Sequence, residues 1–142
     1  MLHQKDPTID VVISGRKIVL DDGSLLSAAP EDVEKHFADT STLCLFNRAY
    51  RSLPLWALMP SELAPICDRV IYECLKMLPL KLYWHSKPTL MFESHYSNHY
   101  LMANKSPMTA LHDPNWEKLR ANLPILLKKF HSLTGLQLST KA

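Results

Sequence analysis

The segment from Ser61 to Leu78 constrains the fold most, because its apolar residues recur at steps of three and four. That spacing places them along one stripe of an α-helix. The stripe contains Leu63, Ile66, Cys67, Val70, Ile71, Cys74 and Leu78. Ser61 can cap the first turn, and Pro79 must end the helix. The pattern predicts an amphipathic helix over 61–78 onto which the other apolar segments pack.

A second main helix is predicted over 114–134. Asp113 suits the N-cap, and Pro114 suits the first helical position, where its missing N–H has no helical partner to lose. An apolar stripe then runs toward Gly135, the expected terminator. The stripe contains Trp116, Leu119, Leu123, Leu126, Phe130 and Leu133. Because Pro124 interrupts it, we expect a kink or two abutting helices.

Short strands are predicted near the N-terminus. Residues 9–13 and 17–20 are β-branched runs separated by a turn candidate at 14–16. Asp22-Gly23 is a hairpin signal, so a third short strand is expected at Leu25. The pattern indicates a hairpin or small meander.

The middle of the chain contains further strand patterns. Residues 42–46 are apolar on both faces, which is typical of an interior strand. Residues 80–85 alternate between apolar and polar, which predicts a half-buried strand. A turn at 86–88 should then send the chain back over 89–92. The pattern of 94–102 fits a third strand or a short helix.

These elements predict an α+β fold, in which a small, mainly antiparallel sheet packs against the two main helices. Pro30, followed by two acidic residues, adds a short helix near 30–38. With 46% hydrophobic residues, the chain is expected to form a single domain over 1–142. Residues 1–8 and 136–142 are predicted to be loose termini.

Missing motifs narrow the classes of function. The three glycines lie far apart in the sequence, which argues against a phosphate-binding loop, a dinucleotide fingerprint and a nucleophile elbow. No HExxH, EF-hand loop or CxxC occurs, so no cofactor and no metal are expected. No apolar run reaches the ~18–20 residues that span a bilayer, and no secretory signal is visible. We therefore expect a cytoplasmic protein with no membrane contact, whose three cysteines are small core residues.

The proline-bracketed run LPLWALMP, residues 53–60, is the leading candidate for an interface. Trp56 and Met59 are adaptable contact residues of kinds enriched at interfaces. The predicted rim of the interface consists of Arg48, Tyr50 and Arg51. The alternative is that Trp56 and Met59 close over one end of the core. Extra apolar surface on the last helix could also serve a homodimer.

A histidine-rich segment is the candidate for chemistry. His95 and His99 would share one face of a helix, a usual spacing for two metal ligands, or would flank the turn of a hairpin. Glu93 or Asp113 could complete a metal site or act as an acid–base partner. The competing interpretation is that all of these are polar turn residues.

Basic residues form the third candidate site. The net charge is only +2, but the second half of the chain is basic and the first half acidic. Four basic side chains fall on the last predicted helix, namely Lys118, Arg120, Lys128 and Lys129. They could bind phosphates, with neighbouring tyrosines stacking on unpaired bases. The competing interpretation is that lysines on a helix usually form only its solvated face.

Because enzymatic signatures are missing, the sequence favours a small non-enzymatic protein that acts through protein–protein contacts. It would serve as an adaptor, inhibitor or neutralising partner, binding another protein or itself as a homodimer. One alternative is a nucleic-acid-binding protein that uses the basic second half. The other is a small hydrolase-like or metal-binding protein that uses Glu93, His95 and His99.

Overall fold

The computed structural model describes residues 6–26 and 38–138. Its strands are β1 (Val11–Val19), β2 (Leu25–Leu26), β3 (Leu43–Leu45) and β4 (Leu82–Glu93). Its α-helices are α3 (Pro54–Ala57), α4 (Cys67–Met77), α5 (Ser97–Ala103) and α6 (Trp116–Thr134). Three 3-10 segments join them, namely η1 (Thr40–Thr42), η2 (Asn47–Ser52) and η3 (Ser61–Ile66). The chain is one α+β domain, as predicted.

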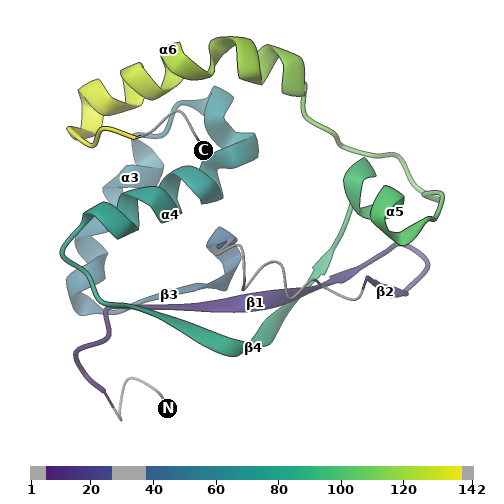
Figure 1. Ribbon diagram of the computed structural model, residues 1–142, viewed down its shortest axis with the longest axis horizontal. Coiled ribbons are helices and arrows are strands. Elements are labelled where there is room, and N and C mark those ends of the chain that lie inside the picture. The colour runs from purple at the N-terminus through teal and green to yellow at the C-terminus, as the bar shows by residue number, and fades with distance from the viewer. Residues whose placement is uncertain (1–5, 27–37, 139–142) are drawn as a thin grey trace.

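All strand pairing is centred on β1 (Figure 1). β2 and β3 pair with it antiparallel, whereas β4 pairs with it in parallel on both sides of an interruption at 86–89. The sheet is therefore mixed: β2 and β3 pair antiparallel with β1, as predicted, whereas the longest pairing is parallel. A parallel pair needs a long crossover connection. Here that connection includes α3 and α4, which bring the chain back across one face of the sheet.

β1 and β4 are each continuous where the sequence predicted turns. The register shifts between Ser14, opposite His85, and Arg16, opposite Leu90. Residues 86–89 therefore bulge out of β4 instead of reversing the chain. The hydroxyls of Ser14 and Thr89 lie 2.5 Å apart and link the strands at the bulge. Residues 86–88 interrupt the strand, as their turn pattern suggests. The chain nevertheless continues in the same direction, because the residues on both sides of them pair with β1.

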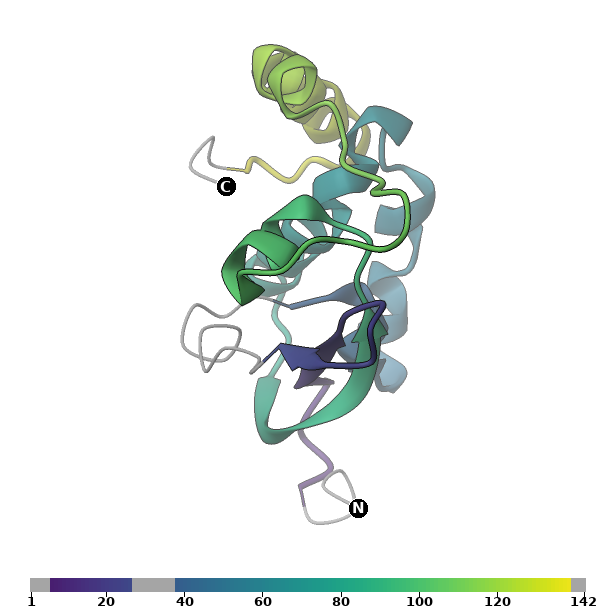
Figure 2. The same cartoon turned by 90° about the vertical axis from the view of Figure 1, so that its right-hand side faces the viewer.

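Helix α4 lies between the sheet and α6, so the molecule has three layers (Figures 1 and 2). Val70, Ile71 and Leu75 of α4 are fully buried, as is Phe130 of α6. Each such aliphatic side chain contributes roughly 1.5–3 kcal/mol by its burial. The predicted burial of this apolar stripe in the core is confirmed for these residues of α4.

The predicted helix over 61–78 is two segments, because Pro65 lies inside it. Proline removes a backbone donor and clashes with the preceding turn of an α-helix. The first part is accordingly the 3-10 segment η3, and the α-helix starts only at Cys67. Leu63 and Ile66 of η3 are nevertheless buried, as the stripe predicted.

The last helix starts later than predicted and is not divided. The side chain of Asn115 caps α6 by accepting the Lys118 N–H at 2.9 Å. Asp113 instead accepts the N–H of Ser97, the first residue of α5, at 3.0 Å. α6 continues through Pro124 and ends at Gly135, whose φ of 73° confirms the predicted terminator. The undecided segment 94–102 forms helix α5 rather than a strand.

The remaining fold predictions concern β3, the ends of the chain and the segment near 30–38. β3 lies at an edge of the sheet beside β1, and Cys44 is exposed there, so the prediction of an interior strand is wrong. Leu136 and Leu138 pack against the core beyond the predicted end of the ordered chain. The helix predicted near 30–38 falls mostly on 27–37, outside the described residues. Among residues 6–26 and 38–138, no helix combines the length and the hydropathy that a membrane span needs.

A buried carboxylate joins three segments at the start of the sheet. Asp10 accepts the Lys81 N–H at 2.7 Å and two hydrogen bonds from Arg48, at 2.6 and 2.9 Å. The Asp10 side chain is buried, whereas that of Arg48 is largely exposed. The carboxylate thus ties β1 to η2 and to the residue before β4.

We expect Asp10→Ala to lower the free energy of unfolding by roughly 2 kcal/mol, because it leaves the Lys81 N–H without its acceptor. Urea denaturation measures this loss. The control is Glu117→Ala on the exposed first turn of α6, with an expected change of about 0.5 kcal/mol or less. Equal effects of the two changes would contradict a structural role for Asp10.

The cysteines should differ sharply in reactivity, because a thiol must be both accessible and ionised to react. Cys44 is exposed, whereas Cys74 is buried and burial raises its pKa to about 11. We expect one fast reaction with a thiol reagent at neutral pH, lost in Cys44→Ser. A fast phase that persists in this variant would contradict the assignment.

Candidate functional site

We name one exposed part of the molecule the connector surface. It consists of Tyr50 and Arg51 in η2, Leu53 just before α3 and Leu58 just after α3. The exposed fractions of its apolar residues are 55% for Tyr50, 52% for Leu53 and 37% for Leu58. Trp56 and Met59, predicted as contact residues, are partly buried and pack against the core. They therefore support the surface from beneath, and their neighbours present the apolar side chains to solvent.

The two arginines of the predicted rim differ in their surroundings. Arg48 has a structural role, because it holds the buried Asp10 carboxylate and also donates to the Thr8 carbonyl at 2.8 Å. Arg51 is exposed in the last turn of η2. Arg51 is thus the better rim residue.

The four basic residues predicted to bind nucleic acid are all exposed on α6, but they do not line one common groove. Lys118 and Lys129 line a groove of about 680 Å³ between α6 and η3. Arg120 lines a separate hollow beside Trp116, together with Arg69. The basic residues are therefore spread around the helix rather than gathered along one strip.

The histidine-rich segment is likewise divided. Glu93 is exposed at the end of β4, and the ring of His95 lies 5.8 Å from that of His112. His95 precedes α5, so it does not share a helix face with His99, which is buried within α5. No group of three or more His, Cys, Asp or Glu in the described parts of the chain could hold a metal ion.

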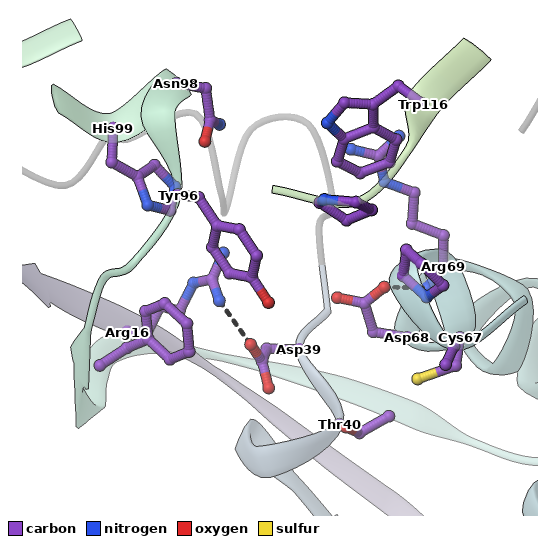
Figure 3. Close-up of a pocket in the computed structure, with 14 residues that line it drawn as sticks. Arg16, Asp39, Thr40, Cys67, Asp68, Arg69, Tyr96, Asn98, His99 and Trp116 are labelled. Atoms are coloured by element: carbon purple, nitrogen blue, oxygen red, sulfur yellow. Dashed lines mark hydrogen bonds and ion pairs between the residues drawn. The ribbon is translucent and has the colours of Figure 1, made fainter. Parts of the chain in front are cut away.

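A polar pocket of about 270 Å³ opens where the sheet, η1, α4, α5 and the start of α6 meet (Figure 3). His99 is the only predicted site residue that lines it. The other labelled polar and aromatic residues in Figure 3 are Arg16, Asp39, Thr40, Cys67, Asp68, Arg69, Tyr96, Asn98 and Trp116. Pockets that gather polar groups from several elements are favoured places for ligands.

An ion pair forms one wall of this pocket. Arg16 of β1 contacts Asp39, and their side chains are only 10% and 15% exposed. The Arg16 guanidinium carbon also lies 4.6 Å from the centre of the Phe92 ring, a cation–π geometry. Asp39 additionally accepts the Ser41 N–H at 2.8 Å, so η1 holds its carboxylate in place. The charge of Arg16 is therefore balanced inside the protein.

A buried Ser94–His99 pair supports the opposite wall. The Ser94 hydroxyl lies 2.5 Å from His99 Nδ1 and accepts the Tyr96 N–H at 3.2 Å. Burial, aided by the charge of Arg16, lowers the pKa of His99, so its neutral imidazole is favoured. Ser94 is fully buried and hence unavailable to a substrate as a nucleophile. The pair orients Tyr96 and α5.

The first turn of α4 supplies the third wall. Burial raises the pKa of the Asp68 carboxyl, although Asp68 accepts the Arg69 N–H at 2.8 Å. Burial and the neighbouring Asp68 also raise the pKa of the Cys67 thiol, which makes it a weak nucleophile. Asp68 is thus a partly buried acid, and the nearby charges of Arg69 and Arg16 counteract the effect of its burial on the pKa.

The geometry of these sites can be set against known proteins. Comparison with protein-family models, curated proteins and solved structures finds no match. Arg16, Asp39 and Asp68 could not be found from the sequence, because no local spacing links them.

The protonation of His99 should make the folded protein less stable as the pH falls. Its pKa in the folded protein is below the ordinary value of 6.5, so below that pH the unfolded chain binds the proton more readily. We expect the free energy of unfolding to decrease between pH 7 and pH 5, and this decrease to be smaller in His99→Gln. Chemical denaturation at several pH values measures it, with the exposed His131→Gln as control. Identical pH profiles for wild type and His99→Gln would contradict the prediction.

Proposed function

We propose that this chain acts through protein–protein contact at the connector surface, with a second copy of itself as the first partner to test. The observation that carries the proposal is the exposure of Tyr50, Leu53 and Leu58 within nine consecutive residues. Adaptor, inhibitor and neutralising protein are the roles that such a contact serves. No catalytic step is part of the proposal.

Neighbouring residues hold the connector surface to the core. Trp56 and Met59 anchor it to the core from below, and Leu55 of α3 is itself buried. A preformed apolar face loses little conformational entropy when a partner covers it. Large apolar and aromatic side chains supply most of the binding energy at such centres.

The same surface is suited to a symmetric contact. In a two-fold dimer each patch meets its own copy, so it must contain both halves of each interaction. Tyr50 and Arg51 can supply both halves of a cation–π pair, the ring from one copy and the guanidinium from the other. Leu53 and Leu58 would fill the apolar centre.

Sedimentation velocity over a range of concentrations tests the proposal. We expect the wild type to self-associate and Leu53→Ser to shift the dissociation constant upward by about tenfold or more, because a buried leucine contributes on the order of 2 kcal/mol. Leu133→Ser on α6 is the matched control, since Leu133 is 50% exposed but lies outside the connector surface. Far-UV circular dichroism checks that each variant folds.

A monomer at every concentration would exclude the second copy as partner. The tagged wild type, Leu53→Ser and Leu133→Ser would then be compared for the proteins that they retain in cells. If Leu53→Ser retains the same proteins as the control, the connector surface is the wrong site.

A further inference from the structure

We propose that the polar pocket of Figure 3 binds a small primary amine in its protonated form, with the ammonium group between Tyr96, Asp39 and Asp68. None of the residues that line this pocket belongs to the connector surface. The proposal therefore stands apart from the proposed protein–protein contact.

Three oxygen acceptors converge in the pocket. Figure 3 shows the Tyr96 hydroxyl and the Asp68 carboxylate facing a common space, which is bordered by the Asp39 carboxylate with one oxygen bonded to Arg16. A primary ammonium group has three N–H donors and no acceptor, which matches such a set. Hydrogen bonds between a charged donor and a carboxylate are the strong ones, so this arrangement selects for a cation.

Two arginines and two aspartates line the pocket, so the positions of their charges decide which ligand charge it suits. Arg16 is already paired with Asp39 within the wall. Arg69 is exposed and extends toward Trp116 in Figure 3, so its charge lies toward the rim. Burial raises the pKa of Asp68, although the charges of Arg69 and Arg16 act to lower it. A bound ammonium would add a further positive charge beside this carboxylate.

The remaining walls suit a short aliphatic chain. Ala64, Pro65 and Pro114 line the pocket beside Trp116 and offer carbon surfaces without free donors. A volume of about 270 Å³ lies below the ~300–1,000 Å³ of typical drug-sized sites, so the ligand must be small. An amine with a few carbon atoms satisfies both conditions.

The test is an NMR titration of the ¹⁵N-labelled protein with butylammonium chloride at constant ionic strength. We expect saturable shifts of the Trp116 indole N–H and the Asn98 side-chain amide. Butanol has the same carbon chain without the charge, and butyltrimethylammonium has the charge without N–H donors. Both should bind more weakly by about tenfold or more, because each lacks charged hydrogen bonds.

Two substitutions locate the head group. Asp68→Asn should weaken butylammonium binding by about tenfold or more, and Tyr96→Phe by a smaller factor, since one neutral acceptor is removed. Glu117→Gln is the control, because it removes an acid next to Trp116 that does not line the pocket. The ¹⁵N spectrum of each variant shows whether it is folded, and Tyr96→Phe serves if Asp68→Asn is not.

Several results would overturn the proposal. They are no saturable shift with butylammonium, equal binding of butanol, stronger binding of butyrate than of butylammonium, and unchanged binding in the folded Asp68→Asn or Tyr96→Phe variant. Equal binding of butyltrimethylammonium would likewise contradict recognition by N–H donors. Loss of self-association in Leu53→Ser has no bearing on these outcomes.

Discussion

The parallel pairing of β1 with β4 is the interaction on which the rest of the structure depends. It joins residues about seventy positions apart, and the intervening chain must therefore cross one face of the sheet. That crossing places α4 over Val11 and Ile13 of β1 and so creates the core. The buried Asp10 carboxylate fixes the start of this pairing, because it binds Lys81 and Arg48 at once.

The register shift within this pairing positions the pocket. Beyond the bulge, Arg16 pairs with Leu90 and Ile18 pairs with Phe92. Arg16 and Phe92 then lie on neighbouring strands two positions apart, which brings the guanidinium over the ring. If the turn residues 86–88 had reversed the chain, this contact could not form. A local irregularity in the sheet thus determines the geometry of a ligand-sized pocket.

Features that depend on local spacing could be predicted, and features that depend on distant partners could not. The stripes of α4 and α6 and the terminator Gly135 follow from periodicity and backbone conformation alone. The direction of β4 depends on β1, which its own residues do not reveal. The pocket draws Arg16, Asp39 and Asp68 from three elements that the sequence does not connect. Only His99 had a local signal, and its partner is Ser94 rather than the predicted Glu93 or His95.

Segment η3 lies between the two proposed sites in the sequence. It follows directly on residues 53–60, which include part of the connector surface, and its Ala64 and Pro65 line the pocket. Leu63 and Ile66 are buried on its other side, and Pro60 and Pro65 restrict its backbone. A segment anchored in this way has little freedom to transmit a displacement from Met59 to Asp68. The connector surface and the pocket are therefore best understood as two fixed faces of one core, each open to substitution without loss of the other.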